Sequence, residues 1–104
     1  MNEQRHALIT LGSPVASAEV SERLGEVDVH FHVDAGHTTP GVRSRLVAEV
    51  FALPELRESH QLRASMPLGD AELLGELRRR CPSHSTRAAG ATCLVEASLA
   101  AARE

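Results

Sequence analysis

Residues 27–33 read VDVHFHV, and this stretch decides the fold. Its apolar residues take every second position: Val27, Val29, Phe31 and Val33. The positions between them carry Asp28, His30 and His32. Because successive side chains of a strand point to opposite faces, this alternation predicts a strand with one buried and one exposed face. A strand covered on both faces would be apolar throughout, so the pattern favours helices on one side of the sheet and a partly open second side.

Apolar periodicity on either side of this strand predicts six further elements. We expect a buried strand over 6–11 and a helix over 14–24, with Ala16, Val20 and Leu24 at i, i+4 spacing and Gly25 at its end. The remaining elements are a helix over 40–53 closed by Pro54, a strand over 61–66, a helix that opens at Gly69-Asp70 and stops at Pro82, and a bent strand or short hairpin over 84–97 broken at Gly90.

The resulting order of elements is βαβαβαβ, which is typical of α/β (α+β) architecture. The chain has 104 residues, the usual size of one domain, so we expect a single domain over 1–104. The half-polar strand at 27–33 favours a small two-layer sandwich. We therefore prefer a ferredoxin-like arrangement to a flavodoxin-like one.

Composition limits the classes of partner. All eleven basic residues are arginine, the net charge is −3, and only two phenylalanines represent the aromatic residues. A nucleic-acid binder would normally show a basic field and stacking side chains, so we expect no nucleic-acid partner. No apolar run is long enough to span a bilayer and no secretory signal is evident, so we expect a cytoplasmic protein. Cys81 and Cys93 do not suggest a disulfide framework, and we expect reduced, partly buried thiols.

Three turns join a strand to a predicted helix, and each offers unpaired backbone N–H groups that suit an anion. They contain Gly12-Ser13-Pro14, Gly36-His37-Thr38-Thr39-Pro40 and Gly69-Asp70. Ordinary helix capping also explains Ser13, Thr39 and Asp70. The ligand-binding candidates are Ser13, Gly36, His37, Thr38, Thr39 and Asp70, and the middle turn is the strongest of the three.

The histidines suggest a metal site. His30 and His32 share one strand face, so both imidazoles are able to reach one ion, and His37 follows five residues later. We therefore consider a divalent metal held by His30, His32 and His37, while an open sheet face also tolerates histidines as plain polar residues. If these histidines do not form a metal site, we expect the protein to bind no cofactor.

These observations support a small binding or regulatory module that recognises a protein partner or a small anionic ligand at a strand-to-helix turn. The polar sheet face also suggests self-association as a homodimer with pH sensitivity. The alternative is a metal-dependent or histidine-assisted enzyme that uses the cluster of His30, His32 and His37. A third hypothesis is an enzyme that handles acyl or phosphate groups at the capped turns. The sequence leaves open whether the chain is an enzyme, with the balance toward a non-enzymatic module.

Overall fold

The computed structural model describes residues 4–11, 16–34 and 41–99, which form a six-stranded sheet and three helices. The strands are β1 (Arg5–Leu11), β2 (Ala16–Arg23), β3 (Glu26–Val33), β4 (Gln61–Pro67), β5 (His84–Ala89) and β6 (Thr92–Ser98). The helices are α1 (Val42–Phe51), α2 (Pro54–Arg57) and α3 (Ala71–Arg80). The sheet order is β1-β2-β3-β4-β6-β5, and only β3 and β4 pair in parallel.

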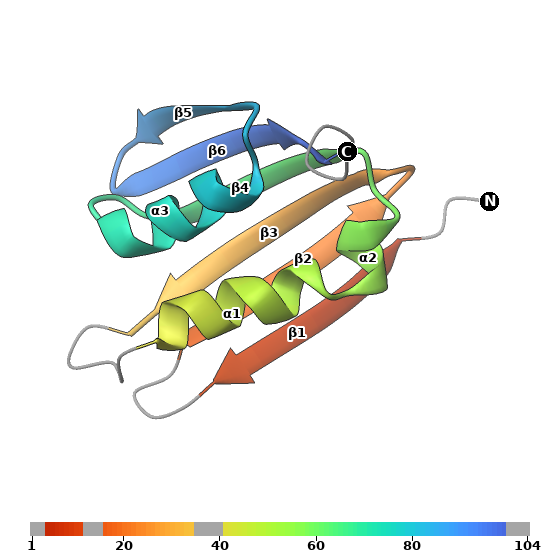
Figure 1. Cartoon of the computed structure of the whole chain (residues 1–104), viewed down its shortest axis with the longest axis horizontal. Helices are drawn as coiled ribbons and strands as arrows, with labels where there is room; N and C mark the ends of the chain where they lie inside the picture. Colours follow the sequence, from red (N-terminus) through yellow and green to blue (C-terminus); the bar gives the residue numbers. More distant parts are fainter. Residues whose placement is uncertain (1–3, 12–15, 35–40, 100–104) are drawn as a thin grey trace.

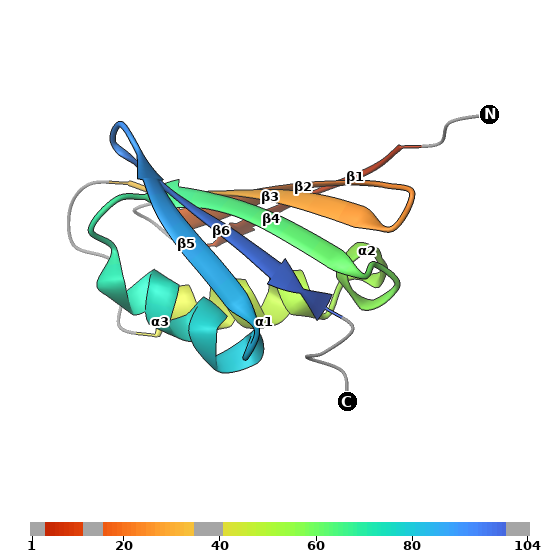
Figure 2. The ribbon, with the colours of Figure 1, turned by 90° about the horizontal axis from the view of Figure 1, so that it is seen from above.

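The molecule has two layers, with the helices gathered on one side of the sheet (Figure 2). In Figure 1, α1 crosses β1 and β2 while α3 lies over β4 and β6. The opposite side of the sheet carries no described helix, and we call it the open face. A mixed α/β sandwich with one uncovered sheet face agrees with the sequence-based prediction.

The alternation at 27–33 is confirmed. Val27, Val29 and Phe31 are buried under the helices, whereas His30 and His32 are exposed on the open face. The strand predicted over 61–66 is β4, and the same alternation places its Leu62, Ala64 and Met66 in the core. Burial of each of these side chains larger than alanine contributes about 1.5–3 kcal/mol, so these two central strands anchor the sheet.

The helix predicted over 14–24 is wrong in the described residues, because Ala16–Arg23 forms strand β2. A spacing of four residues fits both a helix and a strand, since four is also an even number. The intervening residue decides the matter: Ala18 is buried between Ala16 and Val20, which is the two-residue period of a strand. Gly25 then closes a two-residue hairpin turn with Leu24, at φ 81° and 56°, instead of ending a helix.

This correction also changes the order of elements. The chain runs through three antiparallel strands before its first helix, so the predicted βαβαβαβ order is wrong and the ferredoxin-like preference is not confirmed. The second half follows the prediction more closely. The segment after Pro82 is the hairpin of β5 and β6, which turns at Gly90.

The core lies between the sheet and the helices. Leu46, Val47 and Val50 of α1 are fully buried, and Leu73 and Leu77 of α3 meet the same cluster. The helix predicted over 40–53 is shorter, and Pro54 begins α2 in a first-turn position that suits its fixed φ. In the described part of the chain, no helix has the length and apolarity needed to cross a bilayer.

Candidate functional site

The parallel strands β3 and β4 separate before they end. They pair from Glu26 and Gln61 up to His30 and Ser65, and no pair follows within the described residues. Beyond that point β3 continues beside β2, and β4 continues beside β6. Figure 1 shows the two strands moving apart toward their C-terminal ends. We call the region between Phe31–Val33 and Met66–Pro67 the open seam.

A proline explains why the pairing stops. Gln61 donates its N–H to Gly25 on the β3 side, and Leu68 donates its N–H to Ala91 on the β6 side. Because backbone groups alternate along a strand, Pro67 occupies a position whose N–H would face β3. Proline has no such hydrogen, so it cannot donate to the ladder. The carbonyl of Pro67 instead accepts from the N–H of Asp70 at 3.3 Å.

The edge of β3 is left with backbone groups that β4 does not pair. The same alternation turns the carbonyl of Phe31 and the N–H of Val33 toward the open seam. The carbonyl of Phe31 is an acceptor and the N–H of Val33 is a donor. They follow each other along β3 in the order in which a neighbouring parallel strand would pair with them. An extended ligand with an amide group matches this order, as an added strand does at a sheet edge.

The start of α1 follows this edge along the chain. Gly41 precedes the helix at φ 86°, a conformation that glycine adopts without strain, and no side chain caps the first turn. The first turn contains no acidic residue, and Arg43 and Arg45 lie within it or directly after it. Arg43 is paired with Asp70 of the α3 start at 2.9 Å, so the helix N-terminus and exposed Arg45 are the groups of this turn that favour an anion.

A small apolar hollow adjoins the end of β4. Its volume is about 150 Å³, and it is lined by Met66, Pro67, Leu68, Gly69, Asp70, Ala71, Leu74 and Cys93. Met66 and Pro67 belong to both the hollow and the open seam. The hollow offers space for a short apolar group beside the strand ends.

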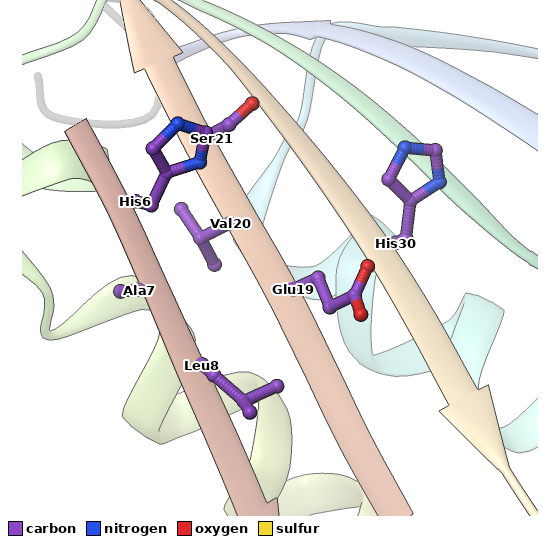
Figure 3. Close-up of a pocket in the computed structure, with 7 residues that line it drawn as sticks. All are labelled: His6, Ala7, Leu8, Glu19, Val20, Ser21 and His30. Atoms are coloured by element: carbon purple, nitrogen blue, oxygen red, sulfur yellow. The ribbon is translucent and has the colours of Figure 1, made fainter. Parts of the chain in front are cut away.

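The open face carries a row of side chains aligned by the strand register. From β1 to β5 the row contains Leu8, Glu19, His30, Ser65, Leu94 and Arg87. Nδ1 of His30 lies 2.5 Å from Oγ of Ser65. Figure 3 shows Glu19 reaching from β2 toward β3, where His30 projects from the same face. His30 lines two hollows, one over β1–β3 and one of about 240 Å³ over β3, β4 and β6.

The predicted anion-binding residues have different outcomes. Ser13, Gly36, His37, Thr38 and Thr39 lie outside the described residues, so the turn at 36–40 stays a prediction. Asp70 caps α3 by accepting the N–H of Leu73 at 3.1 Å. Both of its oxygens also lie 2.9 Å from Nε of Arg43. Arg43, held in this way, is half-buried.

The predicted metal site is not assembled by the described residues. His32 pairs with Asp34 at 2.7 Å, while His30 contacts Ser65. No group of three histidine, cysteine, aspartate or glutamate side chains in the described segments is arranged to hold an ion. His37 is outside those segments, so the three-histidine site stays a prediction.

His60, His84 and the cysteines do not join the histidines of β3, whereas His6 of β1 lines one hollow together with His30. His60 lies next to Gly25 at the opposite end of β3, and Nδ1 of His84 contacts the carbonyl of Cys81 at 2.8 Å. Cys81 and Cys93 are both buried and unbridged, as the sequence suggested. Burial raises the pKa of the Cys81 thiol, although nearby Arg80 opposes the effect. A raised pKa disfavours the reactive thiolate.

Sequence reasoning missed three residues of this arrangement: Glu19, Ser65 and Pro67. Glu19 was assigned to a helix, which removed it from the open face. Ser65 lies in the strand predicted over 61–66, but its contact with His30 depends on β3 and β4 being neighbours. Pro67 directly follows the strand predicted over 61–66 and has no predicted role. A proline that directly follows an alternating strand was the available signal, because it limits the pairing of that strand.

Comparison with known proteins finds a likeness in structure but not in sequence family. The sequence matches no family model. No curated protein matches it either. The chain is similar in structure to the "putative acetyltransferase from Sphaerobacter thermophilus DSM 20745", with a TM-score of 0.56 and 13% sequence identity. The match covers 92% of this chain and 66% of the Sphaerobacter chain, so this chain spans just under two thirds of that protein's length. At this identity the likeness shows a shared fold.

Proposed function

We propose that this chain binds an extended, anionic acyl carrier in the open seam between β3 and β4. The carrier has an amide-containing arm that lies along β3, an acidic end near the start of α1, and an acyl end at the closed end of the seam. This function combines the anion site expected from the sequence with the acyl-handling hypothesis.

The observation that carries the proposal is the end of β3–β4 pairing at His30 and Ser65. Past this pair, β3 presents an acceptor on Phe31 and a donor on Val33 that β4 does not pair within the described residues. Unpaired backbone groups are costly when they are shielded from water, so a ligand amide that pairs with them gains affinity. A sheet that stayed paired to Pro67 would leave no such edge.

Two further observations support the kind of ligand. The first turn of α1 has backbone N–H groups without a side-chain cap and no acidic residue of its own, which favours phosphate or carboxylate groups, and exposed Arg45 lies directly after it. The structural likeness to a protein named as an acetyltransferase suggests an acetyl group as the acyl end. Acetyl-coenzyme A has all three parts, namely phosphates, amides in an extended arm and an acetyl thioester. We therefore choose it as the probe.

Residue-resolved NMR tests the proposal. Acetyl-coenzyme A is titrated into the isotope-labelled full chain, and amide shifts and hydrogen exchange are recorded. We expect the amide of Val33 to shift and to exchange more slowly, because it gains a hydrogen-bond acceptor. The amides of Val42 and Ser44 should shift as well, and those of β5 should stay unchanged.

A pair of charge reversals provides the matched control. Arg45→Glu places a negative charge beside the start of α1 and should weaken binding at least several-fold by calorimetry. Arg23→Glu makes the same change at the far end of β2, where Arg23 pairs in register with Glu26, and should have little effect. Equal losses in both variants, or amide shifts confined to β5 and β6, would contradict the proposal.

A further inference from the structure

The last paired residues before the open seam bring a hydroxyl and an imidazole together. Ser65 Oγ and His30 Nδ1 are 2.5 Å apart, on adjacent strands and on the open face. When Nε2 holds the ring proton, Nδ1 accepts the hydroxyl hydrogen of Ser65. This is the relation between a serine nucleophile and its general base.

An acidic side chain completes the row. Glu19 stands directly opposite His30 in the register of β2 and β3. Cross-strand neighbours on one face lie about 5 Å apart at their Cβ atoms, so the carboxylate of Glu19 is close enough to stabilise a positively charged imidazole. Figure 3 shows this carboxylate on the side of His30 that faces β2. Acid, base and nucleophile thus occupy three adjacent strands.

The pair is open to a reactant. His30 is exposed and Ser65 is half-buried, and both line the hollow of about 240 Å³ over β3, β4 and β6. Arg63 and Arg87 line the same hollow. Its polar margin and modest size suit an acyl group together with a small acceptor molecule.

We propose that Ser65 is a nucleophile that accepts an acyl group from a thioester, with His30 as its general base. The natural donor in this inference is the carrier of the proposed function, bound with its acyl end at the closed end of the seam. Oγ of Ser65 bonds to the carbonyl carbon while the hydroxyl proton passes to Nδ1 of His30. The carbon–sulfur bond then breaks, and the departing thiolate takes the proton from His30.

The products of this step are an O-acyl serine and a free thiol, so no oxidant or further reactant is consumed. An amine or water then attacks the same carbonyl carbon and loses a proton to His30, which returns it to Oγ of Ser65. Glu19 is a positioning residue in both halves, because it stabilises the imidazolium and does not touch the acyl group.

Acylation by p-nitrophenyl acetate tests the nucleophile directly. The full chain is treated at mildly alkaline pH, and intact mass with peptide mapping locates any added acetyl group. We expect one acetyl group on Ser65 and none after Ser65→Ala. His30→Gln should slow the labelling on the order of 100-fold, the usual contribution of a general base. Glu19→Gln should slow the labelling and leave its site unchanged, and the conservative variant Glu19→Asp should recover much of the rate.

Two variants keep the result interpretable. Ser85→Ala removes an exposed serine from the open face of β5 and should label at the original rate. Ser65→Cys retains a nucleophile and should take up the acetyl group as a thioester, which shows that the site reacts even if Ser65→Ala fails to fold. Labelling spread over several serines, or labelling that persists in Ser65→Ala, would overturn the inference.

The two proposals fail separately. Labelling by p-nitrophenyl acetate without any amide shift from acetyl-coenzyme A would support the nucleophile and overturn the proposed carrier. Amide shifts at Val33 without labelling by either reagent would support the carrier and overturn the nucleophile.

Discussion

At the scale of single residues, Glu22 is an acidic side chain fixed at the end of β2 and only 8% exposed. Its carboxylate accepts the N–H of Gly25 at 3.0 Å and the Nε–H of Arg5 at 2.6 Å. The bond from Gly25, followed by the bond and charge of Arg5, holds the pKa of Glu22 below its usual 4.5, although burial opposes the effect. The ionised form therefore stabilises the fold.

The lowered pKa of Glu22 gives a pH-dependent prediction. Its stabilisation is fully present above the unfolded-state value of about 4.5 and is lost as the pH falls through the lower folded-state value. Glu22→Gln should reduce the free energy of unfolding by about 1–2 kcal/mol at pH 7, because charge-assisted hydrogen bonds are lost. The difference from wild type should shrink below about pH 4.

Urea denaturation at several pH values measures this effect. Glu26→Gln, an exposed change at the start of β3, serves as the control and should alter stability by less than about 0.5 kcal/mol. A loss in Glu22→Gln that is equally large at pH 3 and pH 7 would show that the carboxylate charge is not responsible.

At the scale of helices and strands, the pairing of the strands depends on the turns that join them. The β2–β3 turn uses Gly25 at φ 81°, and a Cβ there would lie 2.6 Å from Nδ1 of His60. Gly25→Ala should destabilise the protein by about 1–2 kcal/mol, because it adds both backbone strain and a close contact. Thermal unfolding of Gly25→Ala and of the double variant with His60→Ala separates the two causes. If the double variant regained the full stability of wild type, the close contact with His60 alone would explain the loss and backbone strain would not contribute.

The start of α3 provides a second prediction at this scale. Asp70→Ala removes the cap of Leu73 and the ion pair with Arg43, and it should cost about 1–2 kcal/mol. Glu72→Ala removes only an exposed contact to Arg43 at 3.7 Å and should cost less than about 0.5 kcal/mol. Because Asp70→Ala also removes a negative charge beside Arg43 at the start of α1, acetyl-coenzyme A should bind the variant at least as tightly as it binds wild type. A lost affinity with unchanged stability would instead make Asp70 a ligand contact.

The elements that were predicted correctly have an apolar pattern that fits only one type of secondary structure. Residues 27–33 change character at every position, so no helical face fits them. Residues 16–23 contain the small residues Ala16 and Ala18. The four-residue spacing of apolar positions in this segment fits both the helical and the strand period. Tertiary pairing with β1 and β3 selects the strand there. Local sequence holds no record of that pairing, which explains the error.

At the scale of the whole molecule, stability depends on contact between the layers. Leu46 is fully buried between α1 and the sheet. Leu46→Ala should lower the free energy of unfolding by about 2–5 kcal/mol in a single cooperative transition. Leu68→Ala, at a position that is 51% exposed, should cost far less. Circular dichroism in urea measures both, and similar losses would contradict the assignment of the core.

The candidate site was predicted in part. His30 and the polar strand face followed from alternation alone, because alternation is a local property. The open seam did not, since it requires β3 and β4 to be neighbours after an intervening stretch of 27 residues, 34–60. The contact between His30 and Ser65 depends on the same long-range pairing. Self-association and the metal site remain predictions from the sequence.

The peptide hydrogen that Pro67 lacks affects more of the molecule than strand β4 alone. Every other residue type would bring a peptide hydrogen to that spot, and β3 and β4 would then have the means to continue as one closed surface. A binding site for an extended amide can thus arise because the main chain lacks one hydrogen, without any additional side chain. Any residue other than proline at position 67 would restore this hydrogen, which would compete with the ligand for the carbonyl of Phe31.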